Sequence, residues 1–221
     1  MTSYTRDDQL AVQPEATFGG RIETSGAYIG RLTMAKERTA KTGTRGIEFN
    51  FEADDGRVAR YLTLWVARAN GEKIEYPFSL LSALMACLDV KAIESVSTMV
   101  DEWSADRGTM VPTEAQVFES LMNKPIGLLL QREEREWEGK TYVSMKIVQF
   151  FDPQDRSTPA EILSGQRSGV SLDKMVTNLR ETVVRVDAPP TGATPMGSSS
   201  PSSSSTNSGN FAEIDDDDVP F

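Results

Sequence analysis

Five basic residues lie between positions 31 and 45, in a segment that contains only one acid, Glu37. Its local net charge of +4 contrasts with a total of −10 for the chain. Small residues separate the charges, so the segment can follow an anionic backbone. This pattern is typical of contacts to nucleic-acid phosphates, although a solvated hairpin tip would have the same composition. The candidate phosphate contacts are Arg31, Lys36, Arg38, Lys41 and Arg45.

Aromatic side chains could supply a second kind of contact, because bases stack on exposed rings for roughly 1–3 kcal/mol each. Residues 58–66 alternate, with Leu62 and Leu64 on one face and Tyr61 and Trp65 on the other. We expect the aliphatic face to be buried and the two rings to lie outside the core. The basic residues Arg57 and Arg60 are close to them in sequence.

Two further groups of rings have other expected roles. Phe49 and Phe51 share a parity with Ile47 and are predicted to belong to the core. Trp137 and Tyr142 flank a predicted hairpin turn, where they could form a second stacking platform. They could equally pack against each other across the hairpin.

The C-terminal end combines acids with an apolar tip, in the order Asp215, Asp216, Asp217, Asp218, Val219, Pro220 and Phe221. A run of aspartates repels itself and does not pack. A partner with a basic surface and a hydrophobic hole could bind both the carboxylates and the ring. The alternative is a solubilising acidic tail, which does not explain the terminal ring.

Composition excludes several classes of chemistry. The chain has no histidine, so Ser-His-Asp and Cys-His nucleophile systems are absent. The one cysteine, Cys87, lies on an apolar helical pattern and is expected in the core rather than at a reactive site. We therefore expect a protein that is not an enzyme and that needs no metal or cofactor. With no apolar leader or spanning segment, we expect a cytoplasmic location and no membrane partner.

Three strands and a hairpin are predicted to position these residues. The strands are expected at 26–36, 46–53 and 58–66, with Tyr28, Leu32 and Met34 on one parity of the first. Asn70-Gly71 indicates a tight turn before a short strand at 73–76. Residues 126–137 and 141–151 are expected to form a final hairpin.

Helices are predicted between these strands and after them. One begins at Pro77, where Leu81, Leu84, Met85 and Leu88 are spaced for a buried face. A second covers 93–103, and a third begins at Thr113 with a capping-box pattern. A last helix is indicated from 172 to 183, with Ser171 as its cap.

The order of three strands, helices and two strands predicts a mainly β protein with helices, an OB-fold Greek-key barrel with a helical insertion between strands 3 and 4. An unrelated α+β sandwich could have the same order. We expect a flexible N-terminus at 1–20, one domain at 21–187, a Ser-rich disordered linker at 188–210 and an acidic tip at 211–221.

Two segments resemble known proteins. The acidic ending with Pro220 and Phe221 resembles that of bacterial and phage single-stranded DNA-binding proteins. The body from about Gly26 to Pro153 is similar to phage-encoded members of that class, most clearly at 43–49 and 123–127. The resemblance implies an OB-fold, binding of single-stranded DNA without sequence readout, and a tip that binds replication, recombination and repair proteins. It also implies the host cytoplasm as location and allows self-association on DNA.

A rival function remains open. Half of the net charge lies after residue 187, where five acids and no base occur, so the body is itself acidic. The chain could be an adaptor or DNA mimic that presents an acidic peptide to replication or repair enzymes without touching DNA.

Overall fold

The computed structural model describes residues 19–104, 107–137, 140–180 and 182–185. For residues 103–104, 135–137, 140–141 and 182–185 it describes the backbone only. The predictions for the N-terminus before residue 19, for the linker at 188–210 and for the tip at 211–221 lie outside the described residues.

An antiparallel meander of three long strands forms the centre of the fold, as predicted. These strands are β2 (Gly26–Thr39), β3 (Arg45–Ala53) and β4 (Arg57–Ala67). Their inward faces bury alternate residues, including Phe49, Phe51 and Leu62, each at most 2% exposed. The predicted core position of the two phenylalanines is therefore confirmed. A two-residue strand, β1 (Gly20–Arg21), pairs in parallel with β4.

A bulge in β2 changes which of its residues enter the core. The ladder to β3 pairs Leu32 with Phe51 and then Met34 with Asn50, which leaves Thr33 as an extra residue. The predicted parity of Tyr28, Leu32 and Met34 is therefore wrong after Leu32. Ala35 is fully buried in place of Met34, because an extra residue turns every following side chain to the opposite face.

The predicted final hairpin is confirmed as β7 (Pro125–Trp137) and β8 (Lys140–Phe151). The first half of β7 pairs with β2, so β2 has a neighbour on both edges. A short strand, β9 (Thr182–Arg185), lies parallel to the second half of β7. Phe150 meets Phe49 edge to face at 6.5 Å, which joins the hairpin to the meander through the core.

The first predicted helix is confirmed as α2 (Glu75–Cys87), which contacts β4 and β8. It begins before Pro77, so the predicted strand at 73–76 is reduced to one bridge between Ala67 and Lys73. The inner face of α2 is buried and includes Leu80, Leu81 and Leu84.

The second and third predicted helices are wrong. Residues 96–104 and 109–117 form a hairpin of two strands, β5 (Val96–Ser104) and β6 (Thr109–Val117). β-branched residues, which favour strands, are frequent in both segments. Nine residue pairs form the antiparallel ladder between them. The capping-box pattern at Thr113 predicted a helix there, but a helix at this position would lose these cross-strand pairs.

The C-terminal part of the domain contains two short helices, α3 (Pro159–Ser164) and α4 (Val170–Asn178). The last predicted helix, at 172–183, is observed as α4 and ends earlier than expected, because 182–185 form β9 instead. The predicted cap Ser171 is also wrong, since Gly169 occupies the N-cap in a left-handed conformation. A single 3₁₀ turn, η1 (Glu119–Leu121), joins β6 to β7.

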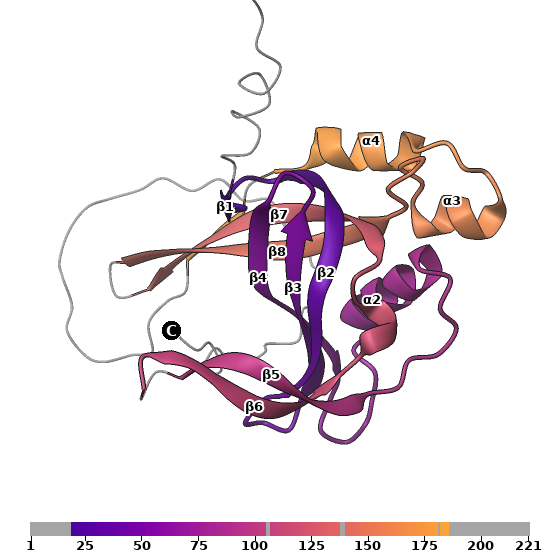
Figure 1. Cartoon of the computed structure of the whole chain (residues 1–221). Coiled ribbons are helices and arrows are strands. Elements are labelled where there is room, and N and C mark those ends of the chain that lie inside the picture. Colours follow the sequence, from indigo (N-terminus) through magenta and orange to yellow (C-terminus); the bar gives the residue numbers. More distant parts are fainter. Residues whose placement is uncertain (1–18, 105–106, 138–139, 181, 186–221) are drawn as a thin grey trace, which may run out of the picture.

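The molecule is mainly β, with a sheet that curls into a half-barrel (Figure 1). The strand order is β1-β4-β3-β2-β6-β5, with β7 also beside β2. The predicted insertion after the third long strand is one helix followed by the β5–β6 hairpin. In Figure 1 this hairpin and the β7–β8 hairpin both extend past the meander on the same side.

Cys87 at the end of α2 provides a test of this packing. The side chain is half-buried beside the core. Burial, with the nearby charge of Asp152, raises the pKa of the thiol to about 12. At mildly alkaline pH we expect iodoacetamide to alkylate the native protein roughly a thousandfold more slowly than the urea-unfolded protein. Intact-mass time courses measure both rates, and equal rates would contradict the packing of α2.

Candidate functional site

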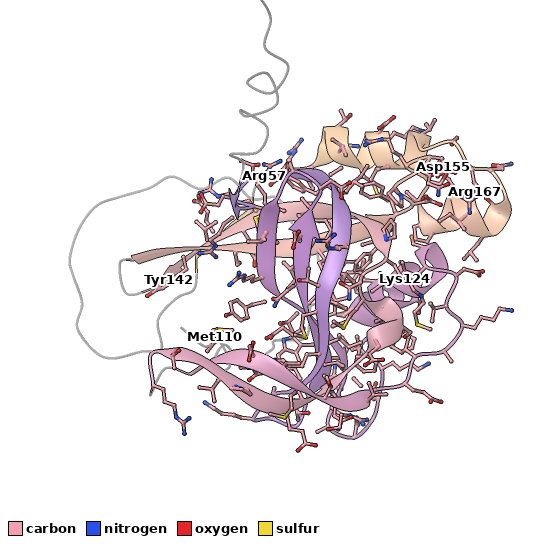
Figure 2. All side chains as sticks on the ribbon, viewed as in Figure 1. Arg57, Met110, Lys124, Tyr142, Asp155 and Arg167 are labelled. Atoms are coloured by element: carbon pink, nitrogen blue, oxygen red, sulfur yellow. The ribbon has the colours of Figure 1, made fainter. Side chains whose placement is uncertain are left out.

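A groove lies between the outer face of the meander and the β5–β6 hairpin. Its volume is about 410 Å³. Met34, Asn50 and Tyr61 line it from the sheet, and Val100 and Met110 line it from the hairpin. Figure 2 labels Met110 on β6 and Tyr142 on β8, on the two hairpins that extend past the meander. The groove is mixed in character, with apolar side chains beside amides and charges.

Tyr61 is the most unusual residue of this groove. Its side chain is 60% exposed, and its backbone has a φ of 60°, in the left-handed region. A bulge places Arg60 and Tyr61 opposite the single residue Asn50, whose Oδ1 accepts a hydrogen bond from the Tyr61 N–H at 3.2 Å. This backbone costs a non-glycine residue about 1–2 kcal/mol. The bulge turns an aromatic ring into the groove and away from the core.

Trp65 also lies on the outer face of β4, as predicted, but it is half-buried. It pairs with Gly46 across the ladder, and its ring covers that residue. A Cβ at Gly46 would lie 2.9 Å from the Trp65 Cε3 and 2.5 Å from the Leu64 carbonyl oxygen. The absence of a side chain at Gly46 therefore leaves room for the indole of Trp65 beside it.

The predicted phosphate contacts Arg31, Lys36 and Arg38 form ion pairs within the protein. Arg31 pairs with Glu52 at 2.8 Å, and Arg38 pairs with Glu48 at 3.0 Å. Lys36 pairs with Glu48 at 3.3 Å and with Glu102 of β5.

These pairs largely cancel the charge of the basic segment. Side chains lining the groove include two cations and four acids, so the groove is not electropositive. Glu48 is the central acid, because it is only 5% exposed and shared by two cations. Burial alone would lower the pKa of Lys36, but the hydrogen bond to Glu102 and the charge of Glu48 raise it, so the ammonium stays charged.

Sequence reasoning missed all three acids, Glu48, Glu52 and Glu102. For two of them a signal exists once the register is known, because Lys36 stands directly opposite Glu48 and Arg31 opposite Glu52 on the β2–β3 ladder. Glu102 has no such signal, because it comes from a hairpin that the sequence pattern indicated as helices.

The other predicted basic residues are dispersed. Arg60 lines the groove and makes no ion pair with any described residue. Arg45 is exposed at the start of β3, and Lys41 lies in the turn before it. Arg57 is held away from the groove, since its guanidinium binds Asp55 and stacks 5.0 Å from the centre of the Tyr28 ring.

The predicted second platform is described only in part. The Trp137 backbone pairs with Lys140, but its side chain lies outside the described residues. Tyr142 is 37% exposed on β8, opposite Arg135 in the ladder. The predicted tip from Asp215 to Phe221 also lies outside the described residues.

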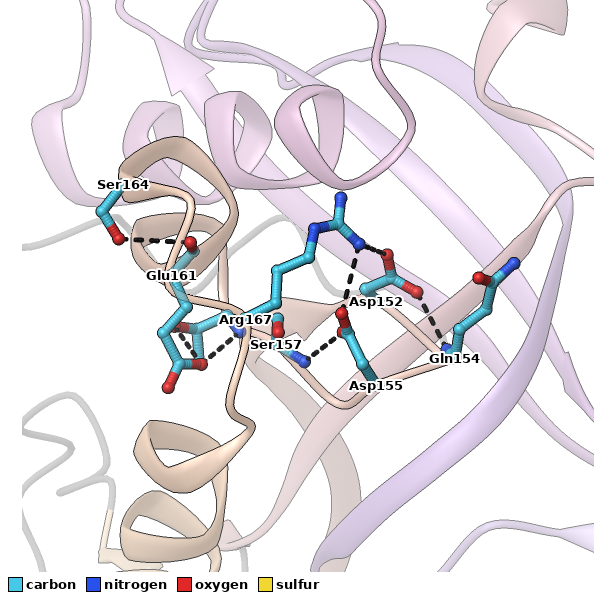
Figure 3. Close-up of polar contacts among 8 residues, drawn as sticks. Asp152, Gln154, Asp155, Ser157, Glu161, Ser164 and Arg167 are labelled. Carbon is cyan, nitrogen blue, oxygen red and sulfur yellow. Dashed lines mark hydrogen bonds and ion pairs between the residues drawn. The ribbon is translucent and has the colours of Figure 1, made fainter.

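A second polar cluster joins β8 to α3 and α4 (Figure 3). Arg167 binds Asp152 at 2.8 Å and Asp155 at 3.2 Å. Glu161 accepts hydrogen bonds from the Thr158 N–H, the Ser168 hydroxyl and the Ser171 N–H. Every carboxylate here is bonded to its own loop or helix ends, so the cluster holds the C-terminal helices in place and leaves no open site.

Neither models of protein families nor the sequences of curated proteins match this chain. Within the part of the chain that the structure describes, every helix is too short or too polar to cross a bilayer.

The Tyr61 backbone predicts a reversal of the usual preference between alanine and glycine. Alanine normally stabilises a strand relative to glycine. At φ 60° the Cβ is the source of strain, so we expect Y61G to be more stable than Y61A by about 1 kcal/mol. Urea unfolding measures the difference. A Y61A protein that is the more stable of the two would show that the bulge is absent in solution.

The Glu161 carboxylate predicts a pH-dependent contribution to stability. Hydrogen bonds from Thr158 and Ser168 lower the pKa of Glu161 from 4.5 to about 2. Because the folded-state pKa is depressed, the stabilisation is present above pH 4.5 and is lost as the pH falls towards about 2. We expect E161Q to be less stable than the parent at neutral pH, with the gap closing over that range. Thermal unfolding across the range measures it, and a constant gap would contradict the assignment.

Proposed function

We propose that this protein binds single-stranded DNA along the groove, with bases stacked on Tyr61 and without sequence readout. The observation that carries the proposal is the strained backbone of Tyr61, which holds an exposed ring in a groove beside Met34 and Met110. Strain of this kind persists where the surrounding structure enforces it, and it concentrates at ligand sites. A tyrosine face can stack on any base, and this accounts for binding without sequence preference.

The fold is compatible with this proposal. We infer that the half-barrel is a variant of the OB-fold, formed by β2, β3, β4, β7 and β8. Two features support this: the five strands occur in the expected order, and β2 pairs with both β3 and β7. The proposed base-binding face is then the outer surface of β2, β3 and β4, which includes the face of the second and third strands where OB-folds bind oligonucleotides.

The tip from Asp215 to Phe221 would give the protein its second role. It would recruit replication, recombination or repair enzymes to the coated strand, as the resemblance to phage-encoded single-stranded DNA-binding proteins implies. Its acids and terminal ring support this proposal through their chemistry alone. Because stacking and phosphate contacts barely distinguish DNA from RNA, binding of RNA would follow the same rules.

One observation favours a second candidate function. The cations Arg31, Lys36 and Arg38 are all paired with carboxylates, and the body of the protein is acidic. A protein that presents its acidic tip to enzymes without binding DNA would have these properties. Absence of DNA binding at low salt would favour this alternative.

Replacement of the groove ring tests DNA binding directly. We expect Y61A to weaken binding of fluorescein-labelled oligo-dT roughly 5- to 150-fold, the equivalent of about 1–3 kcal/mol of lost stacking. Y61F should bind within about twofold of the parent, since the ring is retained. Fluorescence anisotropy at low and moderate salt measures the affinities.

Tyr76 provides a matched control for this experiment. It is 47% exposed on α2 and does not line the groove, so Y76A removes a similar ring elsewhere. Equal losses in Y61A and Y76A, or no binding by the parent protein, would contradict the proposed groove.

A further inference from the structure

The β5–β6 hairpin joins the rest of the sheet through contacts near its root. In the described residues the ladder between β6 and β2 consists of one pair, Lys36 with Val117. The Phe118 N–H also donates to the Ala35 carbonyl at 2.8 Å. Farther out, Met99 and Met110 are 62% and 51% exposed. Beyond the root, the hairpin contributes the buried side chain of Val100 to the groove, and the ion pair between Glu102 and Lys36 ties it to the groove floor.

Lys36 is therefore bound by two carboxylates that differ in how firmly they are held. Glu48 belongs to the central strand β3, its side chain is 7% exposed, and it also pairs with Arg38. Glu102 belongs to the hairpin, and its side chain is 36% exposed. Displacing Glu48 would leave a largely buried carboxylate without its ion-pair partners, which is costly. The more exposed Glu102 carboxylate can move into water at small cost.

The charges of the ion-pair network formed by Lys36, Arg38, Glu48 and Glu102 balance only while Glu102 is in place. Lys36 and Arg38 carry two positive charges, and Glu48 and Glu102 carry two negative charges. If Glu102 withdraws, this network retains two cations and one carboxylate. That remainder matches one monoanion with oxygen acceptors, which is the charge and chemistry of a phosphodiester.

We propose that Lys36 is the phosphate-binding residue of the groove floor, and that the Glu102 carboxylate occupies its site until a phosphodiester of single-stranded DNA replaces it. The inference rests on the proposed function and adds a specific phosphate site to it. The exchange trades one anionic oxygen ligand for another, so the charge of the floor is unchanged and no bond is made or broken.

The test compares two substitutions that remove the same charge from the same hairpin. E102Q removes the competitor of the phosphate. E114Q removes an acid that accepts a hydrogen bond from Ser97 and does not line the groove. We expect E102Q to tighten oligo-dT binding roughly two- to tenfold, the range for releasing one partly exposed ion pair. We expect E114Q to change it by less than about 1.5-fold, because a distant exposed charge is screened. Equal effects of the two substitutions would overturn the inference.

A double substitution tests whether Glu102 acts through Lys36. In a K36M background we expect E102Q to give no further gain, because the phosphate site itself is missing. A gain that persists without Lys36 would overturn the inference, since it would show a general effect of charge. Thermal unfolding verifies that K36M is folded, with Glu48 still paired to Arg38. If K36M does not fold, the comparison of E102Q with E114Q decides alone.

The failure of this inference is distinguishable from the failure of the proposed function. If the parent protein and E102Q both fail to bind oligo-dT at low salt, the proposed function falls, and the phosphate site falls with it. If the parent protein binds and E102Q binds no more tightly than E114Q, only the exchange at Lys36 is wrong.

Discussion

The buried carboxylate of Glu48 is the constraint on which the groove depends. A charge that is 5% exposed must be paired, because removing its partners would cost about 3–5 kcal/mol. Lys36 and Arg38 supply the pairing from the neighbouring strand. Lys36 can do so only because of the bulge at Thr33, which turns it from the core parity of β2 to the outer face. The bulge, the register of β2 on β3 and the ion pairs therefore depend on one another.

A second bulge gives the same face its aromatic residue. In β4 the extra residue places Tyr61 in a left-handed backbone, and the Asn50 side chain opposite it accepts the N–H hydrogen bond. A regular ladder would have left the meander with a plain alternation of core and surface. Of the two side chains most suited to contact a base or a phosphate, Lys36 owes its direction to the bulge in β2, and Tyr61 lies within the bulge of β4.

A groove without an excess of cations limits how an acidic protein could bind a polyanion. Long-range attraction would be weak or unfavourable, so affinity has to come from contacts at short distance. Stacking on Tyr61 does not depend on net charge. Exchange of a phosphodiester for the Glu102 carboxylate at Lys36 would add an ionic contact without leaving a permanent excess of cations in the free protein.

Alternation of apolar and polar residues was sufficient to predict the strands at 46–53 and 58–66 and the outward direction of Tyr61 and Trp65, because these properties repeat locally along the chain. It was not sufficient at 96–104 and 109–117, where a weak helical pattern yields to pairing between the two adjacent strands of a hairpin. Composition alone indicated a basic segment at 31–45, but its acid partners are 10 to 66 residues away. Only the tertiary structure could show that these charges are paired, since strand register and bulges decide which side chains meet, and neither is encoded in the spacing of any single segment.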